Sequence, residues 1–192
     1  MIDIVDRAIG FAARAHNGQQ RKTGDVPYIA HPMGVAMILQ RMGCEPTVVA
    51  AGLLHDTVED TSVTLDEIRL LFGDEVADIV AGCTELPKKK NRWETRKRHM
   101  IASLRDASLE VKLVAAADKY HNLSHTLYTE RTRGSSLWKR FGRGKEQQAW
   151  YYRSVLESLL ANIPQPERYP IFGMLAEVID ELFNDVIARP PG

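Results

Sequence analysis

The sequence contains few cysteines and no long hydrophobic run. Its 192 residues include two cysteines, Cys44 and Cys83, which are too few for a disulfide framework or a cysteine zinc cluster. We expect both to be small buried side chains in a reducing compartment. The longest notable apolar run, 48–54, is much shorter than the roughly 18 residues of a membrane-spanning helix. The N-terminus also lacks the basic-then-apolar pattern of a signal peptide, so we expect a cytoplasmic globular protein without a membrane partner.

Net charge is absent as well, because 25 lysines and arginines balance 25 aspartates and glutamates. A nucleic-acid polymer calls for a basic surface and is therefore not an expected partner. The charges are nevertheless segregated, with acids concentrated in 53–78 and bases in 85–98 and 131–145. Such runs are usually solvated faces. The alternative is that the acids hold a cation while the bases line a pocket for a small phosphorylated ligand.

Helical periodicity covers most of the chain. Apolar residues recur three and four positions apart, Pro46 suits the start of a helix over the run 48–54, and Thr64 to Glu67 forms a capping box. Further helices are predicted over 146–161 and 171–187. No segment alternates with period two, so the predicted fold class is all-α. The basic stretches 86–98 and 130–145 lack apolar periodicity and are predicted to be loops.

Histidine and aspartate stand where apolar helices begin or end. His31 lies at a predicted helix start, His55 and Asp56 follow the apolar run, and Asp118 ends a second apolar, alanine-rich stretch. A carboxylate emerging from an apolar helix is costly unless it is paired or binds a metal. Imidazole and carboxylate together suit a divalent transition metal. A single histidine is more often a packing residue, but this combination predicts a cation between the helices.

Two further acids, Glu59 and Asp60, lie one helical turn beyond His55 and Asp56. Carboxylates in that position can orient or deprotonate a water near the metal, which makes both candidates for catalysis. The alternative is that they simply lead into the turn that follows.

Polar residues flank the metal candidates and could contact substrate. Arg21 and Lys22 precede a Gly and Pro turn that returns the chain to His31; Arg offers a planar fork and Lys a point charge to phosphate. Asn122 comes one helical turn after Asp118 and could reach substrate or support a ligand.

The order of these motifs resembles that of the HD-domain phosphohydrolases. More narrowly, it is similar to the hydrolase domain of the RelA/SpoT alarmone enzymes and to the small alarmone hydrolases. The likeness covers about residues 1 to 127 well and the rest loosely. The matching runs are residues 15–22, 27–32, 53–61 and 117–123.

The resemblance implies a specific fold and reaction. The fold is a single HD-type helical bundle over 1–188, with room for a short hairpin or irregular loops. From its own sequence, the tail at 189–192 is expected to be frayed. The reaction is Mn²⁺-dependent removal of pyrophosphate from the 3′ position of (p)ppGpp, giving GDP or GTP, as in the stringent response. No residues remain for a synthetase module, so hydrolysis without synthesis is expected.

The resemblance also implies the role of each site residue. One Mn²⁺ is held by four ligands, His31, His55, Asp56 and Asp118. The attacking water is served by Glu59 and Asp60. The nucleotide is contacted by Arg21, Lys22 and Asn122.

Ser124 and His125 stand where the family usually continues with arginine. Because this departure affects substrate recognition, two other functions stay open. One is the same chemistry on another phosphorylated nucleotide, such as NADPH or an adenosine alarmone. The other is a non-catalytic regulator that binds an alarmone. The sequence also leaves the oligomeric state open, a homo-oligomer included.

Overall fold

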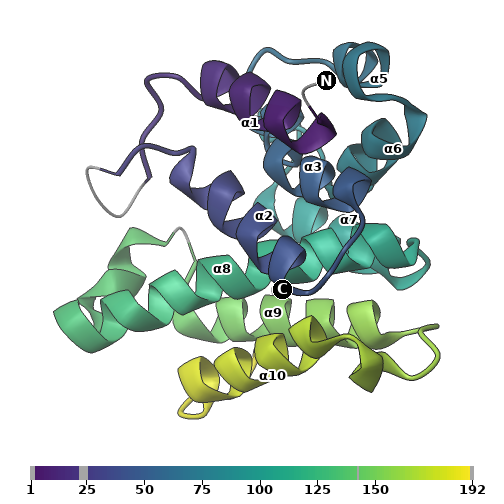
Figure 1. Ribbon diagram of the computed structural model, residues 1–192. Helices are drawn as coiled ribbons and strands as arrows, with labels where there is room; N and C mark the ends of the chain where they lie inside the picture. Colours follow the sequence, from purple (N-terminus) through teal and green to yellow (C-terminus); the bar gives the residue numbers. More distant parts are fainter. Residues whose placement is uncertain (1–2, 22–25, 142, 191–192) are drawn as a thin grey trace. The chain divides into compact units, whose positions relative to one another are not determined.

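The computed structural model describes residues 3–21, 26–141 and 143–190, which form helices joined by short connections (Figure 1). Within these ranges the one strand-like pairing is an isolated antiparallel bridge between Gln20 and Pro27. The predicted all-α class is therefore confirmed. The helices divide into two compact units, residues 1–85 with 108–118 and residues 86–107 with 119–192.

The first unit is built around one buried helix. It contains six helices and the start of a seventh, namely α1 (Ile4–Ala15), α2 (Ala30–Arg41), α3 (Pro46–Leu54), α4 (Thr57–Asp60), α5 (Leu65–Phe72), α6 (Asp74–Cys83) and the first turns of α8 (Leu109–Arg133). Helix α3 contacts α1, α2 and α6, and every residue from Val48 to Leu54 is buried. An apolar run without a polar face requires burial on all sides, as the sequence predicts for this segment.

Small residues let the helices of this unit approach closely. A Cβ atom placed on Gly52 of α3 would lie 2.5 Å from Cδ1 of Leu39 on α2. One placed on Gly82 of α6 would lie 2.7 Å from Cγ2 of Val111 on α8. Real carbon atoms in contact are about 3.5–4.0 Å apart. Glycine at these two positions therefore sets the spacing of the helices around the core.

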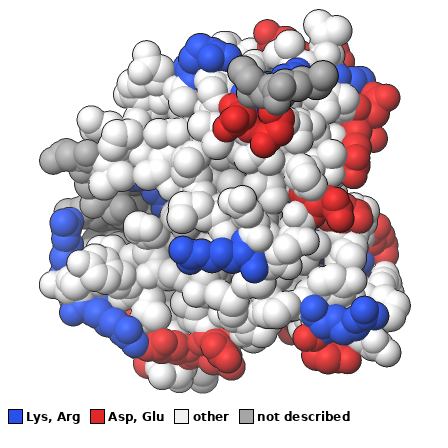
Figure 2. Space-filling model, viewed as in Figure 1, with Lys and Arg blue, Asp and Glu red and all other residues white. Residues whose placement is uncertain are grey.

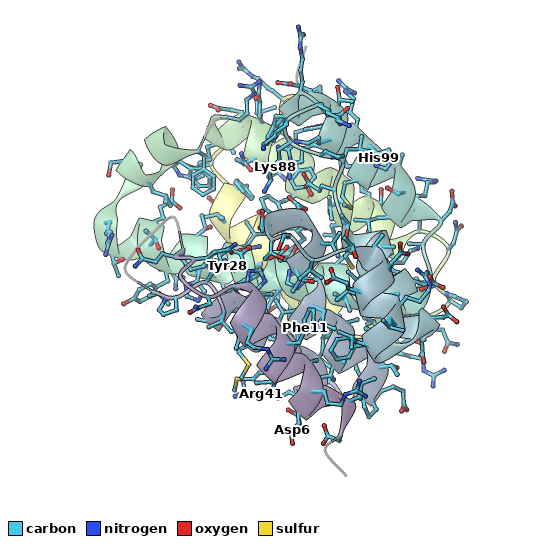
Figure 3. All side chains as sticks on the ribbon, turned by 90° about the horizontal axis from the view of Figure 1, so that it is seen from above. Asp6, Phe11, Tyr28, Arg41, Lys88 and His99 are labelled. Carbon is cyan, nitrogen blue, oxygen red and sulfur yellow. The ribbon has the colours of Figure 1, made fainter. Side chains whose placement is uncertain are left out.

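Local signals fix the helix ends in the first unit. The Thr64 hydroxyl accepts the Glu67 amide proton at 3.2 Å, and the Glu67 carboxylate accepts the Thr64 amide proton at 2.8 Å. The predicted capping box at the start of α5 is therefore confirmed. Helix α5 packs on α1 through an edge-on contact of the Phe72 ring with the ring of Phe11, which Figure 3 labels; the ring centroids are 5.4 Å apart.

The second unit contains the remaining helices. They are α7 (Trp93–Arg105), the rest of α8, α9 (Lys145–Leu160) and α10 (Pro170–Phe183), with 3₁₀ turns at Ser135–Arg140 and Pro166–Arg168. Helix α9 contacts both α7 and α10, and α9 and α10 lie side by side (Figure 1). The helix predicted over 146–161 is confirmed. The helix predicted over 171–187 ends earlier, at Phe183, and the Arg189 amide then donates to the Glu146 carbonyl at 3.2 Å.

The prediction that 86–98 and 130–145 are loops is wrong in part. Helix α7 already begins at Trp93, and α8 continues to Arg133 before the 3₁₀ turn. The Trp93 ring packs 6.3 Å from the Trp150 ring of α9 and 6.3 Å from that of Tyr151. This contact between distant segments stabilises the start of α7, although its sequence lacks an apolar stripe.

Many of the segregated charges pair with each other. In the second unit, Arg131 pairs with Glu181 and Arg143 with Glu94. On the first unit, exposed acids of α5 and α6 gather in one region (Figure 2), where Arg69 contacts two of them. The acids of α5 and α6 therefore form a solvated face.

Neither cysteine is in a disulfide, and both are half-buried rather than fully buried as predicted. Among the described helices, none has the length and apolar composition to cross a membrane.

Candidate metal centre

Four side chains converge in the first unit. Nε2 of His31 lies 3.1 Å from Oδ1 of Asp118 and 3.4 Å from Oδ2 of Asp56. Nε2 of His55 lies 3.2 Å from Oδ2 of Asp56 and 3.8 Å from Oδ1 of Asp118. The structure thus brings together the four residues that the sequence singled out, from α2, the end of α3 and α8.

Burial distinguishes this cluster from a surface group of charges. The exposed fractions of His31, His55 and Asp118 are 1%, 3% and 8%. One ligand atom from each of these three residues lies within 4.8 Å of the other two. Asp56 is the most accessible member, with 17% of its side chain exposed. A divalent cation could therefore be held from inside by three residues, with Asp56 beside both histidines.

The tautomer of His55 follows from its hydrogen bond. Nδ1 lies 2.8 Å from the Gly52 carbonyl oxygen, which can only accept, so Nδ1 carries the proton. The other ring nitrogen, Nε2, is buried and faces the carboxylates of Asp56 and Asp118 at 3.2 and 3.8 Å. Burying these groups together is costly unless a positive charge, from a proton or a cation, lies among them. A histidine whose second nitrogen is anchored to a carbonyl is typical of a metal ligand, so this residue fits a cation.

The two carboxylates make the centre strongly negative. Burial alone would lower the pKa of His55, but Asp56 and Asp118 outweigh it and raise that pKa well above its ordinary value. Burial alone would raise the pKa of Asp56, but His55 and His31 outweigh it and lower that pKa well below its ordinary value. The cluster therefore favours a positive charge among its ligand atoms, which either a proton or a metal cation can supply.

Tyr28 belongs to the site, although its sequence signal gave it no role. Its hydroxyl donates to Oδ2 of Asp56 at 2.6 Å and lies 3.1 Å from Oδ2 of Asp60. Burial, followed by the charge of Asp56, raises the pKa of Tyr28 well above its ordinary value, so the hydroxyl keeps its proton. A buried tyrosine needs a partner for its hydroxyl. That requirement, together with its place three residues before His31, is the signal that could have found it.

The predicted catalytic acids follow the ligand pair as expected. Although α3 ends at Leu54, the Asp60 amide donates to the Asp56 carbonyl at 2.9 Å, so one helical turn does separate the two aspartates. The Asp60 backbone carbonyl in turn accepts from Nε2 of the Gln19 side chain at 2.7 Å. The Glu59 carboxylate accepts from the Glu85 amide at 3.3 Å. Asp60 therefore lies beside the candidate ligands, while Glu59 contacts the segment after α6.

The predicted substrate residues are placed less completely. The chain does return toward His31, because Arg21 N donates to Val26 O at 3.0 Å and Tyr28 N donates to Gln19 O at 2.9 Å. The Arg21 guanidinium lies 5.9 Å from the centre of the Tyr28 ring. Lys22 lies outside the described residues. Asn122, half-buried, follows Asp118 by one turn of α8.

Comparisons with known proteins show which family the chain is similar to. The family model described as "HD domain" matches residues 8–138. A guanosine-3′,5′-bis(diphosphate) 3′-pyrophosphohydrolase of Xenopus tropicalis is 44% identical over 126 residues, covering 62% of this chain and 68% of that protein. A GTP pyrophosphokinase of Streptomyces coelicolor is 42% identical over 131 residues, 66% of this chain. The chain spans only 15% of the length of that bacterial relative.

Two solved structures share the fold. A crystal structure of a Listeria monocytogenes EGD-e protein has a TM-score of 0.76 and 42% identity, covering 81% of this chain and 99% of that one. A structure titled as a metazoan ortholog of SpoT that hydrolyses ppGpp has a TM-score of 0.74 and 26% identity, covering 94% of this chain and 96% of that one. With the family match over residues 8–138, these likenesses show that the chain belongs to the HD domain family.

Proposed function

We propose that this protein is a Mn²⁺-dependent hydrolase that removes pyrophosphate from the 3′ position of guanosine alarmones. The observation that carries the proposal is the buried cluster of His31, His55, Asp56 and Asp118, in which three pairs of imidazole nitrogen and carboxylate oxygen lie 3.1, 3.2 and 3.4 Å apart. Similar proteins named as 3′-pyrophosphohydrolases support the choice of substrate. A cytoplasmic location stays a prediction.

The donor set supports a divalent cation. Two imidazole nitrogens and two carboxylates suit Mn²⁺ and related transition metals, and the family resemblance favours Mn²⁺. When bound, such a cation supplies positive charge that polarises a phosphoryl oxygen and makes a nearby water more acidic. His31, His55 and Asp118 would hold it from the buried side, and Asp56 from the more accessible side.

The acids of α4 would serve the attacking water. In the proposed reaction, the water oxygen bonds to the phosphorus attached to ribose O3′. The bond between that phosphorus and O3′ then breaks, leaving a 3′-hydroxyl and pyrophosphate. Asp60 lies near the Tyr28 hydroxyl and its backbone is held by Gln19, so its carboxylate is fixed in place to accept a proton from the water. We assign Glu59 to the same water as a second carboxylate.

Basic and amide side chains would hold the nucleotide. We assign Arg21 to the base or a phosphate, because its guanidinium is planar and is placed over Tyr28. Lys22 would add positive charge to the phosphates, and Asn122 would contact the ribose. Neutralising the phosphate charge in this way stabilises the transition state.

The test is an assay of pyrophosphate release from ppGpp by the purified chain. We expect release with Mn²⁺, none after chelation, and a loss of at least about 100-fold in Asp118→Asn, which keeps the shape of the ligand but removes its charge. The matched control is Asp66→Asn, because Asp66 is exposed on α5; its rate should stay within about twofold of the parent. No release at micromolar enzyme, or full activity in Asp118→Asn, would refute the proposal.

A second candidate is the same reaction type on another phosphorylated nucleotide. Ser124 and His125 replace the usual arginine of the family, and His125 packs on His121 with ring centroids 4.7 Å apart. Comparing kcat/KM for ppGpp, an adenosine alarmone and NADPH separates these substrates. A non-catalytic regulator would bind the nucleotide but release no product from any of them.

A further inference from the structure

The Tyr28 hydroxyl connects two carboxylates that have different proposed tasks. It has one proton, which it donates to Oδ2 of Asp56 at 2.6 Å, while Oδ2 of Asp60 lies 3.1 Å from the same oxygen. We propose that Tyr28 is a positioning residue whose hydroxyl orients Asp56 toward the cation and Asp60 toward the water, and whose ring supports Arg21. The inference rests on the proposed function for its effect on rate, but not for its effect on cation binding.

The tyrosine is itself held firmly. Its amide donates to the Gln19 carbonyl at 2.9 Å, and its carbonyl accepts from the His31 amide at 2.9 Å. Its ring packs on the ring of His16, with centroids 4.9 Å apart. Nδ1 of His16 lies 2.9 Å from Oε1 of Gln19, and Nε2 of Gln19 donates to the Asp60 carbonyl. These hydrogen bonds and ring contacts therefore hold in place the turn, just before α2, that carries Tyr28 (Figure 3).

The hydroxyl restrains Asp56 directly. Oδ2 of Asp56 faces three groups: the Tyr28 hydroxyl and the Nε2 atoms of His31 and His55. The terminal torsion of an aspartate is broad, so the carboxylate rotates easily when no neighbour fixes it. Without the hydroxyl, the carboxylate of Asp56 loses one of these three groups. Removal of a group that orients a metal ligand lowers metal affinity by about 10- to 100-fold.

The same tyrosine restrains Asp60 and Arg21 through different atoms. The hydroxyl lies beside the Asp60 carboxylate, so its loss should lower kcat. The ring face lies beneath the Arg21 guanidinium, with 5.9 Å from the guanidinium carbon to the ring centroid. A contact of this kind between half-buried side chains corresponds to at least about a threefold change in affinity. Loss of the ring should therefore raise KM.

Two substitutions separate these effects. Tyr28→Phe keeps the ring and removes the hydroxyl; we expect Mn²⁺ affinity about tenfold weaker, kcat about tenfold lower and KM within about twofold. Tyr28→Leu removes both, and we expect KM to rise about threefold in addition. The matched control is Tyr128→Phe, because Tyr128 is 68% exposed; all three quantities should match the parent. Mn²⁺ binding is measured on the metal-free chain by the spin-resonance signal of free Mn²⁺, and far-UV circular dichroism reports folding.

A kinetic cycle with Asp60→Asn tests the route of action. If Tyr28 acts on rate through Asp60, adding Tyr28→Phe to Asp60→Asn lowers kcat by less than about twofold further. A full tenfold further loss, or unchanged Mn²⁺ affinity in a folded Tyr28→Phe, overturns the proposal. If Tyr28→Phe does not fold, Asp60→Asn tests whether the two carboxylates that Tyr28 joins have separate tasks. Parental Mn²⁺ affinity with a lower kcat supports the proposal, and weaker Mn²⁺ binding overturns it. If the parent releases no pyrophosphate, the proposed function fails, and weaker Mn²⁺ binding in Tyr28→Phe still supports the positioning role.

Discussion

Replacing Gly52 by alanine tests whether glycine sets the spacing of α2 and α3. The new methyl group would lie 2.5 Å from Cδ1 of Leu39 and 3.5 Å from Cγ1 of Val35. Leu39 is fully buried, so its neighbours restrict any move away from the methyl group. The helices must separate or Leu39 must leave its rotamer. Because His31 is on α2 and His55 follows α3, the distance between the two candidate ligands should change too.

The expected magnitude comes from two opposing terms. Alanine is preferred over glycine inside a helix by about 1 kcal/mol. Overpacking costs about 1–3 kcal/mol, and a contact this short in a fully buried place belongs at the upper end, about 3 kcal/mol. Gly52→Ala should therefore destabilise the chain by about 2 kcal/mol. For a chain of this length, that lowers Tm by about 4–8 °C.

A second substitution should relieve the clash. Leu39→Val removes the clashing Cδ1 atom and costs about 1 kcal/mol on its own, close to the value of one buried methylene. The double variant keeps the helix preference of alanine without the clash, so its free energy of unfolding should be within about 1 kcal/mol of that of the parent. If the two substitutions acted independently, their separate effects would add to a loss of about 3 kcal/mol. Mn²⁺ affinity should fall in Gly52→Ala and recover in the double variant.

The assay is urea unfolding followed by circular dichroism, with Gly10→Ala as the control. Gly10 lies on α1 of the same unit, and a Cβ atom there meets only Nη1 of Arg14 at an ordinary 3.5 Å. The control should be stabilised by about 0.5–1 kcal/mol. The reasoning about α2 and α3 is refuted if Gly52→Ala is as stable as Gly10→Ala, or if the double variant is additive within about 0.5 kcal/mol.

Three other predictions concern a cap, an ion pair and the cation. Thr64→Ala should lose about 1 kcal/mol, because the hydroxyl caps the Glu67 amide; an unchanged urea midpoint contradicts this. Lys145 pairs with Asp185 at 2.8 Å, and the resulting hydrogen bond lowers the pKa of Asp185. That contribution is present above the ordinary carboxyl pKa of about 3.9 and is lost as pH falls through the lowered value. Lys145→Met should therefore lower Tm at pH 7 and have little effect at pH 2, whereas an equal effect at both would contradict the pairing. Finally, Mn²⁺ at about 100 times its Kd should stabilise the metal-free chain by about 2.7 kcal/mol, with no shift expected in Asp118→Asn.

Local sequence signals correctly predicted the helices and helix ends that depend on their own residues or on close neighbours in the chain. The run 48–54 has no polar face, so burial on all sides followed from composition alone, and α3 is the core of the first unit. The capping box at Thr64 and the proline at 46 act on their own backbone neighbours, and both mark the ends predicted. The start of α7 was missed because it depends on Trp93 meeting Trp150, a contact between residues far apart in the chain.

In the candidate site too, some features follow from the sequence and others from tertiary contacts. The sequence by itself determined which side chains gather at the centre. His31, His55 and Asp56 stand at helix ends, and Asp118, although it lies inside α8, follows an apolar run of that helix; a bare polar group is costly at each of these places. Only the tertiary structure decided how they are held. The proton on Nδ1 of His55 and the Tyr28 hydroxyl beside Asp56 depend on hydrogen bonds whose geometry is fixed only when α2, α3 and α8 pack together.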